Sequence, residues 1–195
     1  MQFYLDRDLD GLVAAAERID VLLVSHHANW TISDSPLETG IEAVSSWDTY
    51  FHNAEAMRAE WNRGQRLCLI GGSDGHRRNA GLGSAVTGVW ARELTSAGIL
   101  VAISNRRTIA TQGRRPMVDF RLSDSEGNSL MIGEHGKLSG EITATISISV
   151  EPGYDDRLEF IELLHREKTL VSWSSSESVP RSLRHRHLLR RLRSA

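Results

Sequence analysis

Short apolar runs and helical patterns alternate through the first part of the chain. The runs are typical of strands buried on both faces of a parallel sheet. They occupy residues 20–25, 41–45, 66–73 and 87–91. Helical spacing with suitable capping residues predicts helices at 8–19, 53–63 and about 95–105. This order of elements favours an α/β fold with parallel strands.

The pattern changes after Pro116, where polar and apolar residues alternate with period two. Residues 117–122 and 141–150 alternate in this way, and residues 158–164 are a third strand candidate. Turn signals separate these segments. The second part is therefore expected to be a small antiparallel, sandwich-like β-domain, with the domain boundary near residues 112–116.

The predicted division assigns residues 1–114 to the α/β part, 115–174 to the β-domain and 175–195 to a basic tail. Residues 172–178 are rich in serine and are typical of a linker. The tail begins with a capping serine and a proline, and its leucines at 188, 189 and 192 share one helical stripe. A helix is therefore the structure expected for the tail.

Charge is distributed unevenly between the tail and the rest of the chain. The formal net charge is −2, but residues 180–195 contain six arginines and no acid. Residues 1–179 contain 17 basic and 25 acidic residues, so this part is not a nucleic-acid-binding surface. The tail could contact an anionic membrane or a nucleic acid. Packing on the acidic body, or a free end, is the favoured interpretation.

The composition, with 40% hydrophobic and 25% charged residues, is that of a soluble globular protein. Cys68 is the only cysteine and lies in an apolar run, which predicts a buried core thiol and fits a reducing compartment. No stretch approaches the roughly 20 apolar residues that cross a bilayer. The amino terminus carries Asp6 and Asp8 where a signal peptide has basic residues. A cytoplasmic location is expected.

Polar side chains follow the first and third predicted strands, at the ends where α/β folds build active sites. His26 and His27 follow the first, and Asp74 and His76 follow the third. One glycine, Gly75, separates Asp74 from His76, so in an extended loop their side chains project to the same side. A carboxylate oxygen with an imidazole nitrogen suits zinc, manganese or iron. An ordinary Asp-Gly turn is the competing interpretation of this spacing.

Longer segments of the chain resemble a known family. They are Val24-Ser25-His26, Gly72-Ser73-Asp74-Gly75-His76, Val89-Trp90-Ala91-Arg92-Glu93-Leu94-Thr95 and Arg106-Arg107-Thr108-Ile109-Ala110-Thr111-Gln112-Gly113. With them, roughly residues 20–165 resemble the carboxyl-terminal portion of the polymerase and histidinol phosphatase (PHP) superfamily. The most similar subset is that of CehA/McbA-like metallohydrolases, also described as domain of unknown function 3604, with an appended β-domain.

The resemblance implies a partial PHP-type (β/α) barrel that holds divalent metal ions at the carboxyl ends of its strands. Asp74 and His76 match the last two metal ligands of the family and would carry catalysis. His26 matches a ligand on an earlier strand, with His27 as the competing assignment. Glu42 matches an acid that borders the site without binding the metal.

The activity implied by the resemblance is hydrolysis of a small phosphoester by water activated on zinc, manganese or iron. Arg77 and Arg78 directly follow His76 and could bind the substrate phosphate through charge-assisted hydrogen bonds. Solvated loop arginines are the favoured interpretation of this pair.

One departure from the family pattern changes the expectation. The family begins with a His-x-His on its first strand, and none precedes His26 here. The first half of the barrel is therefore expected to be missing, in a fragment, one piece of a split protein, or a truncated and inactive relative. A partial barrel leaves two open sheet edges, which predicts a homo-oligomer. The alternative function is a non-catalytic binding or assembly module derived from a PHP protein.

Overall fold

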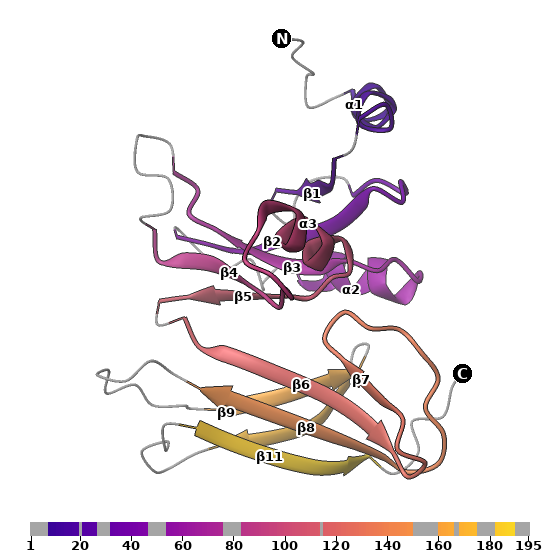
Figure 1. Ribbon diagram of the computed structural model, residues 1–195, viewed down its shortest axis with the longest axis vertical. Helices are drawn as coiled ribbons and strands as arrows, with labels where there is room; N and C mark the ends of the chain where they lie inside the picture. The colour runs from indigo at the N-terminus through magenta and orange to yellow at the C-terminus, as the bar shows by residue number, and fades with distance from the viewer. Residues whose placement is uncertain are drawn as a thin grey trace. The chain divides into compact units, whose positions relative to one another are not determined.

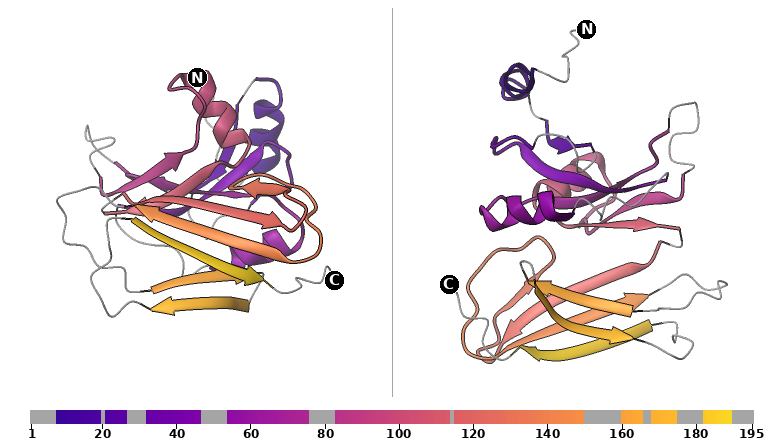
Figure 2. Two further views of the ribbon diagram at one scale, coloured as in Figure 1. Left: turned by 60° about the horizontal axis from the view of Figure 1, so that its bottom comes forward. Right: turned by 180° about the vertical axis from the view of Figure 1, so that it is seen from behind.

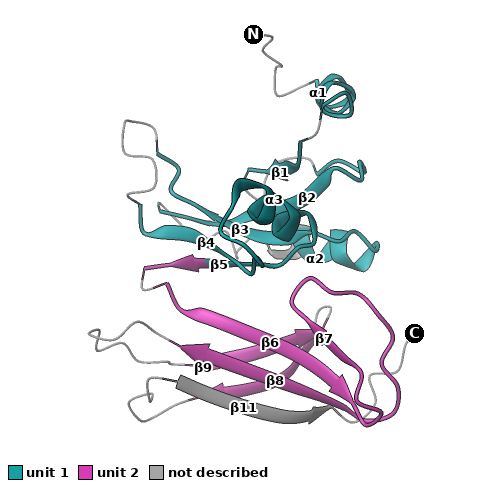
Figure 3. Ribbon diagram, in the orientation of Figure 1, with its two compact units in different colours: residues 1–110 teal, residues 111–195 magenta. Residues whose placement is uncertain are grey.

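The computed structural model describes residues 8–19, 21–26, 32–46, 54–75, 83–113, 115–149, 160–165, 168–174 and 182–189. For residues 54–56 and 182–189 it describes the backbone alone. The chain divides into two compact units, residues 1–110 and 111–195 (Figure 3). The division falls inside strand β5 (Thr108–Gln112), slightly before the boundary predicted from the sequence at 112–116.

Unit 1 contains a parallel sheet of three strands in the order β1-β2-β3 (Figure 1). The strands are β1 (Leu23–Ser25), β2 (Glu38–Ser45) and β3 (Cys68–Gly72). Every residue of β2 is buried, as expected for a central strand that is covered on both faces. The parallel pairing confirms the prediction from the short apolar runs.

Strand β4 (Ala85–Val89) pairs with β5. The sequence pattern did not predict a strand at the position of β5. The hydroxyl of Thr87 joins β4 to β3: it donates to the carbonyl of Gly71 over 2.7 Å and accepts from its N–H over 2.9 Å. A Cβ at Gly71 would lie 2.5 Å from the carbonyl oxygen of Val86. The two backbones therefore approach so closely that this position requires glycine.

The helices of unit 1 are α1 (Leu9–Ala16), α2 (Ala54–Asn62) and α3 (Ser96–Ser104), near the predicted positions. Asp8 caps α1 and Thr95 caps α3, each accepting a backbone N–H over 3.0 Å. Helix α2 contributes Met57 to the buried core, whose other members are Ile41, Ala43, Val44 and Ala85. No helix in the described part of the chain is long and apolar enough to span a membrane.

The pairing of β2 is irregular on both sides. Against β1 the extra residue of β2 is Thr39, and against β3 it is Ala43. Because side chains alternate between the faces of a strand, an extra residue changes which side chains share a face. These bulges therefore help to decide where the acidic side chains of β2 point.

Unit 2 contains two antiparallel sheets, and the antiparallel prediction is confirmed. The larger has the order β11-β8-β6-β7 (Figure 1), built from β6 (Met117–Asp124), β7 (Ser129–Met131), β8 (Ile142–Ser149) and β11 (Ser182–Leu189). The smaller pairs β9 (Phe160–His165) with β10 (Lys168–Ser174), and Figure 2 shows it as a separate layer. Among the described residues of either unit, no strands close into a barrel.

Two predictions for the last part of the chain were wrong. Residues 182–189 of the basic tail form a strand rather than a helix, and residues 172–174 of the expected linker belong to β10. Strand β11 pairs with β8 along its whole length, from Ser182 opposite Ser149 to Leu189 opposite Ile142. Cross-strand hydrogen bonds and an alternating sequence therefore outweigh the helical spacing of the leucines.

Candidate functional site

The carboxylate of Glu42 on β2 contacts the imidazole of His26, which directly follows β1. Oε2 of Glu42 and Nδ1 of His26 make a hydrogen bond, which becomes an ion pair when the imidazole is protonated. The Glu42 side chain is 9% exposed, whereas 43% of the His26 side chain remains exposed. A buried acid thus holds an accessible imidazole.

The register of the parallel strands explains this contact. Val24 pairs with Gly40 and Ser25 with Ile41, so one further step places His26 beside Glu42. Paired residues of neighbouring strands point to the same face of a sheet. The contact is therefore a consequence of the register of β1 against β2.

The other oxygen of Glu42 faces the end of β3. A Cβ at Gly72 would lie 2.5 Å from Oε1 of Glu42, so the absence of a side chain at Gly72 leaves room for the carboxylate. Asp74, two residues further on, is partly buried and adopts a left-handed backbone conformation with φ of +45°. Aspartate tolerates this conformation better than most residues. His26, Glu42 and Asp74 thus belong to three adjacent parallel strands: His26 directly follows β1, Glu42 lies within β2, and Asp74 follows β3.

The remaining site residues predicted from the sequence lie outside the described residues. They are His27, His76, Arg77 and Arg78. Within the described ranges, no group of three or more His, Cys, Asp and Glu side chains is placed to hold a metal ion. The structure brings Glu42 to His26.

A second buried carboxylate holds the residue before His26. Oε1 of Glu38 accepts a hydrogen bond from the Ser25 hydroxyl over 3.1 Å. Oε2 accepts from the Ser33 hydroxyl over 3.0 Å and from the Ser33 N–H over 3.5 Å. Glu38 is 6% exposed, and its two oxygens therefore join the end of β1 to the segment that precedes β2.

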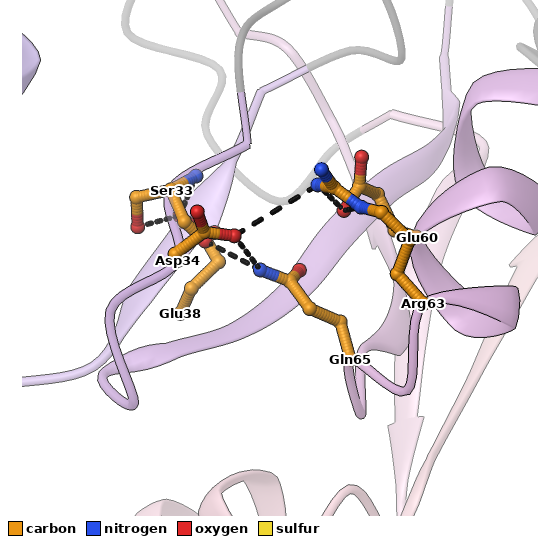
Figure 4. A network of polar contacts seen from close by, with 6 residues as sticks. All are labelled: Ser33, Asp34, Glu38, Glu60, Arg63 and Gln65. Carbon is orange, nitrogen blue, oxygen red and sulfur yellow. Dashed lines mark hydrogen bonds and ion pairs between the residues drawn. The ribbon is translucent and has the colours of Figure 1, made fainter.

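This arrangement continues to the end of helix α2 (Figure 4). The amide of Gln65 donates to the carbonyl of Ser33 over 2.8 Å and to the carboxylate of Asp34 over 3.2 Å. Nη2 of Arg63 lies 3.8 Å from Oδ1 of Asp34. Nε of Arg63 donates to the carboxylate of Glu60, and this hydrogen bond raises the pKa of the guanidinium. The network thus runs from β1 through the 32–37 segment to α2.

Glu38 and Ser25 were not predicted as site residues. The strand predicted at 41–45 began too late to include Glu38, which is the first residue of β2. An acidic residue at the edge of an apolar strand was the available signal. The sequence does not reveal that Ser25 and Ser33 converge on it, because that depends on the bulge at Thr39.

Cys68 takes no part in this site. It is 5% exposed, as predicted for a core thiol, and a Cβ at Gly40 would lie 2.7 Å from its sulfur. Burial raises the pKa of the thiol, and a hydrogen bond with Thr108 opposes this only in part. A protonated, buried thiol is a poor nucleophile and metal ligand.

The Arg-Arg-Thr segment that contributes to the family resemblance has contacts within the fold. The guanidinium of Arg106 donates to the backbone carbonyls of Arg66 and Ser104. Burial lowers the pKa of Arg106, and the nearby charge of Arg66 acts in the same direction. The hydroxyl of Thr108 donates to the carbonyl of Leu69 over 2.7 Å. These residues connect the α3–β5 segment to β3.

No model of a known protein family matches the chain, and no curated protein or solved structure matches it.

Proposed function

We propose that the chain is a metal-dependent hydrolase of the phosphoesterase type, related to the carboxyl-terminal part of PHP proteins. The observation that carries the proposal is the contact between Glu42, within β2, and Nδ1 of His26, just beyond the carboxyl end of the adjacent parallel strand β1. Histidines that bind metals commonly donate their second ring N–H to a carboxylate, which fixes the ring and its tautomer. Three described residues of suitable donor chemistry lie on adjacent parallel strands or just beyond them: His26 after β1, Glu42 within β2 and Asp74 after β3.

The proposed roles follow from the described contacts. Glu42 accepts a hydrogen bond from Nδ1–H of His26, and Nε2 is then the nitrogen that would hold the metal. Asp74 would supply a carboxylate oxygen, and His76 is proposed as a further ligand on the basis of the family resemblance. A bound zinc, manganese or iron ion would lower the pKa of a water molecule towards about 7 and polarise the ester oxygen.

Metal content tests the proposal directly. The purified chain is loaded with Zn²⁺ or Mn²⁺, dialysed and analysed for bound metal, and hydrolysis of a chromogenic phosphomonoester and phosphodiester is measured. Asp74→Ala and His76→Ala are expected to lose most of the bound metal. His135→Ala is the matched control, because this histidine is exposed and lies in unit 2. Unchanged metal content in the first two variants would exclude the site.

A second candidate function is a non-catalytic assembly module. It is favoured by exposed apolar side chains in and before helix α3: Leu94 is 96% exposed, Leu100 53% and Val101 60%. Apolar residues exposed together are typical of interaction surfaces. A metal-free, inactive chain that forms a homo-oligomer in sedimentation experiments, and becomes a monomer on Leu100→Glu, would support this candidate over the hydrolase.

A further inference from the structure

Two consecutive residues at the end of β1 are held by two different glutamates of β2. Ser25 donates to Glu38 over 3.1 Å, and His26 contacts Glu42. Both carboxylates are buried, with exposed fractions of 6% for Glu38 and 7% for Glu42. Burying a carboxylate is costly unless hydrogen bonds compensate for the lost water, so such a pair requires a physical reason.

The two contacts lie on opposite faces of the sheet. Ser25 pairs with Ile41, and successive residues of a strand point to opposite faces, so His26 points away from the face of Ser25. Glu38 reaches the Ser25 face because the extra residue Thr39 shifts the alternation of β2. The end of β1 is thus fixed from both sides.

We propose that Glu38 is a positioning residue for His26. It holds the Ser25 side chain on one face, and the alternation of the strand then directs the imidazole of His26 to the other face, against Glu42. This inference rests on the proposed function, in which His26 binds the metal. Its new content is that the donor direction of His26 depends on a carboxylate that touches neither the metal nor the imidazole.

A separate anchor enables Glu38 to act in this way. Its second oxygen is held by the hydroxyl and the N–H of Ser33, and the carbonyl of Ser33 accepts from Gln65 over 2.8 Å (Figure 4). Glu38 is therefore fixed to the 32–37 segment independently of Ser25. A carboxylate anchored on one oxygen can restrain a mobile hydroxyl with the other.

The experiment uses the whole chain and two readouts. The tautomer of His26 is measured from the ¹⁵N shifts of its ring nitrogens, assigned by comparison with His26→Gln, and affinity for Zn²⁺ alone is measured by calorimetry. Ser25→Ala is expected to lower the population of the Nδ1–H tautomer. It should also weaken zinc binding about fivefold, the equivalent of one ordinary hydrogen bond.

Two matched variants separate positioning from general loosening. Ser33→Ala removes one anchor of the same carboxylate but leaves Ser25 and the Ser33 N–H in place, so it should shift the tautomer less than Ser25→Ala does. Glu38→Gln should keep the wild-type tautomer, because the amide can donate to Ser25 while its oxygen accepts from Ser33. If Ser25→Ala does not fold, Ser25→Cys offers a weaker donor of similar size and should give a smaller shift in the same direction.

A wild-type tautomer in Ser25→Ala, or an equal shift in Ser33→Ala, would overturn the proposal. Failure of the proposed function has a different signature. In that case the wild-type chain binds no zinc, while the tautomer of His26 still reports whether Glu38 directs the ring.

Discussion

Glu42 and His26 are neighbours in space because the register of β1 against β2 continues one residue beyond the end of β1. The acid is buried and the imidazole is half exposed, so the pair offers an oriented ring nitrogen at the surface of unit 1. An orienting carboxylate and an accessible imidazole are the parts from which proteins build one ligand of a metal site.

Removal of the Glu42 carboxylate should weaken metal binding without abolishing it. We expect Glu42→Ala to lower zinc affinity by about 10- to 100-fold, the usual effect of losing a partner that orients a histidine ligand. Glu42→Gln should lose less zinc affinity, since its amide oxygen still accepts a hydrogen bond from Nδ1 of His26. Calorimetric titration with Zn²⁺ measures both, with exposed Glu93→Ala as the control. Equal affinity in Glu42→Ala and the wild type would contradict the proposed role.

A methyl group at Gly72 should act on the same carboxylate from the other side. The Cβ of Gly72→Ala would lie 2.5 Å from Oε1 of Glu42, and the flexible side chain can move away. Zinc affinity should fall about tenfold while the Tm changes little. Gly88→Ala is the matched control, because its Cβ meets Ile109 in the neighbouring strand at 2.6 Å and not Glu42. A loss of zinc binding in both variants would point to a general disturbance.

The hydroxyl of Thr87 should contribute measurably to the stability of unit 1. Thr87→Val keeps the shape of the side chain but removes both hydrogen bonds to Gly71. The N–H and carbonyl of Gly71 then lose this partner in a part-buried position, so we expect the free energy of unfolding to fall by about 1–3 kcal/mol. Urea denaturation followed by tryptophan fluorescence measures the change. An unaltered midpoint would show that water replaces the hydroxyl at no cost.

Asp124 should make the stability of unit 2 sensitive to acid. Hydrogen bonds from the Asn128 side chain and from the N–H groups of Ser139, Asn128 and Glu126 lower the pKa of this carboxyl. A carboxyl with a lowered pKa in the folded state stabilises the fold above its ordinary pKa, and this contribution is lost as the pH falls through the folded-state pKa. The Tm of Asp124→Asn should therefore fall less than that of the wild type between neutral pH and pH about 2. Parallel Tm curves would exclude this role.

Amide exchange distinguishes the strand β11 from a helical tail. An edge strand in an antiparallel pair bonds only every second N–H to its neighbour, whereas a helix protects consecutive N–H groups. Residues 182–189 should therefore show alternating slow and fast exchange by NMR. Consecutive protection, or none, would contradict the pairing with β8.

The sequence predicted most elements of unit 1, because these have a local cause. Apolar runs marked β1 and β3, and the caps Asp8 and Thr95 marked α1 and α3. The contact between His26 and Glu42 has no local cause. It depends on how two strands pair, and a shift of one residue would reverse the faces.

The errors in unit 2 have the same origin. The leucines near the end of the chain fit a helical stripe, but the partner of Ser182–Leu189 is β8, which lies far away in sequence. Strand β10 ends in serines, and its pairing with β9 became visible only in the structure. Local propensity is a weak guide where a long-range partner decides the conformation.

The position of β11 also bears on the order of folding. Ser182 pairs with Ser149 across more than thirty positions of sequence, whereas β6 and β7 pair within a short hairpin. Closing a long loop costs entropy before its contacts form, and an edge strand has only one neighbour to retain it. We therefore expect β11 to pair with β8 last during folding and to detach first under denaturing stress. The pairing of β11 with β8 is then the part of this sheet that opens most easily.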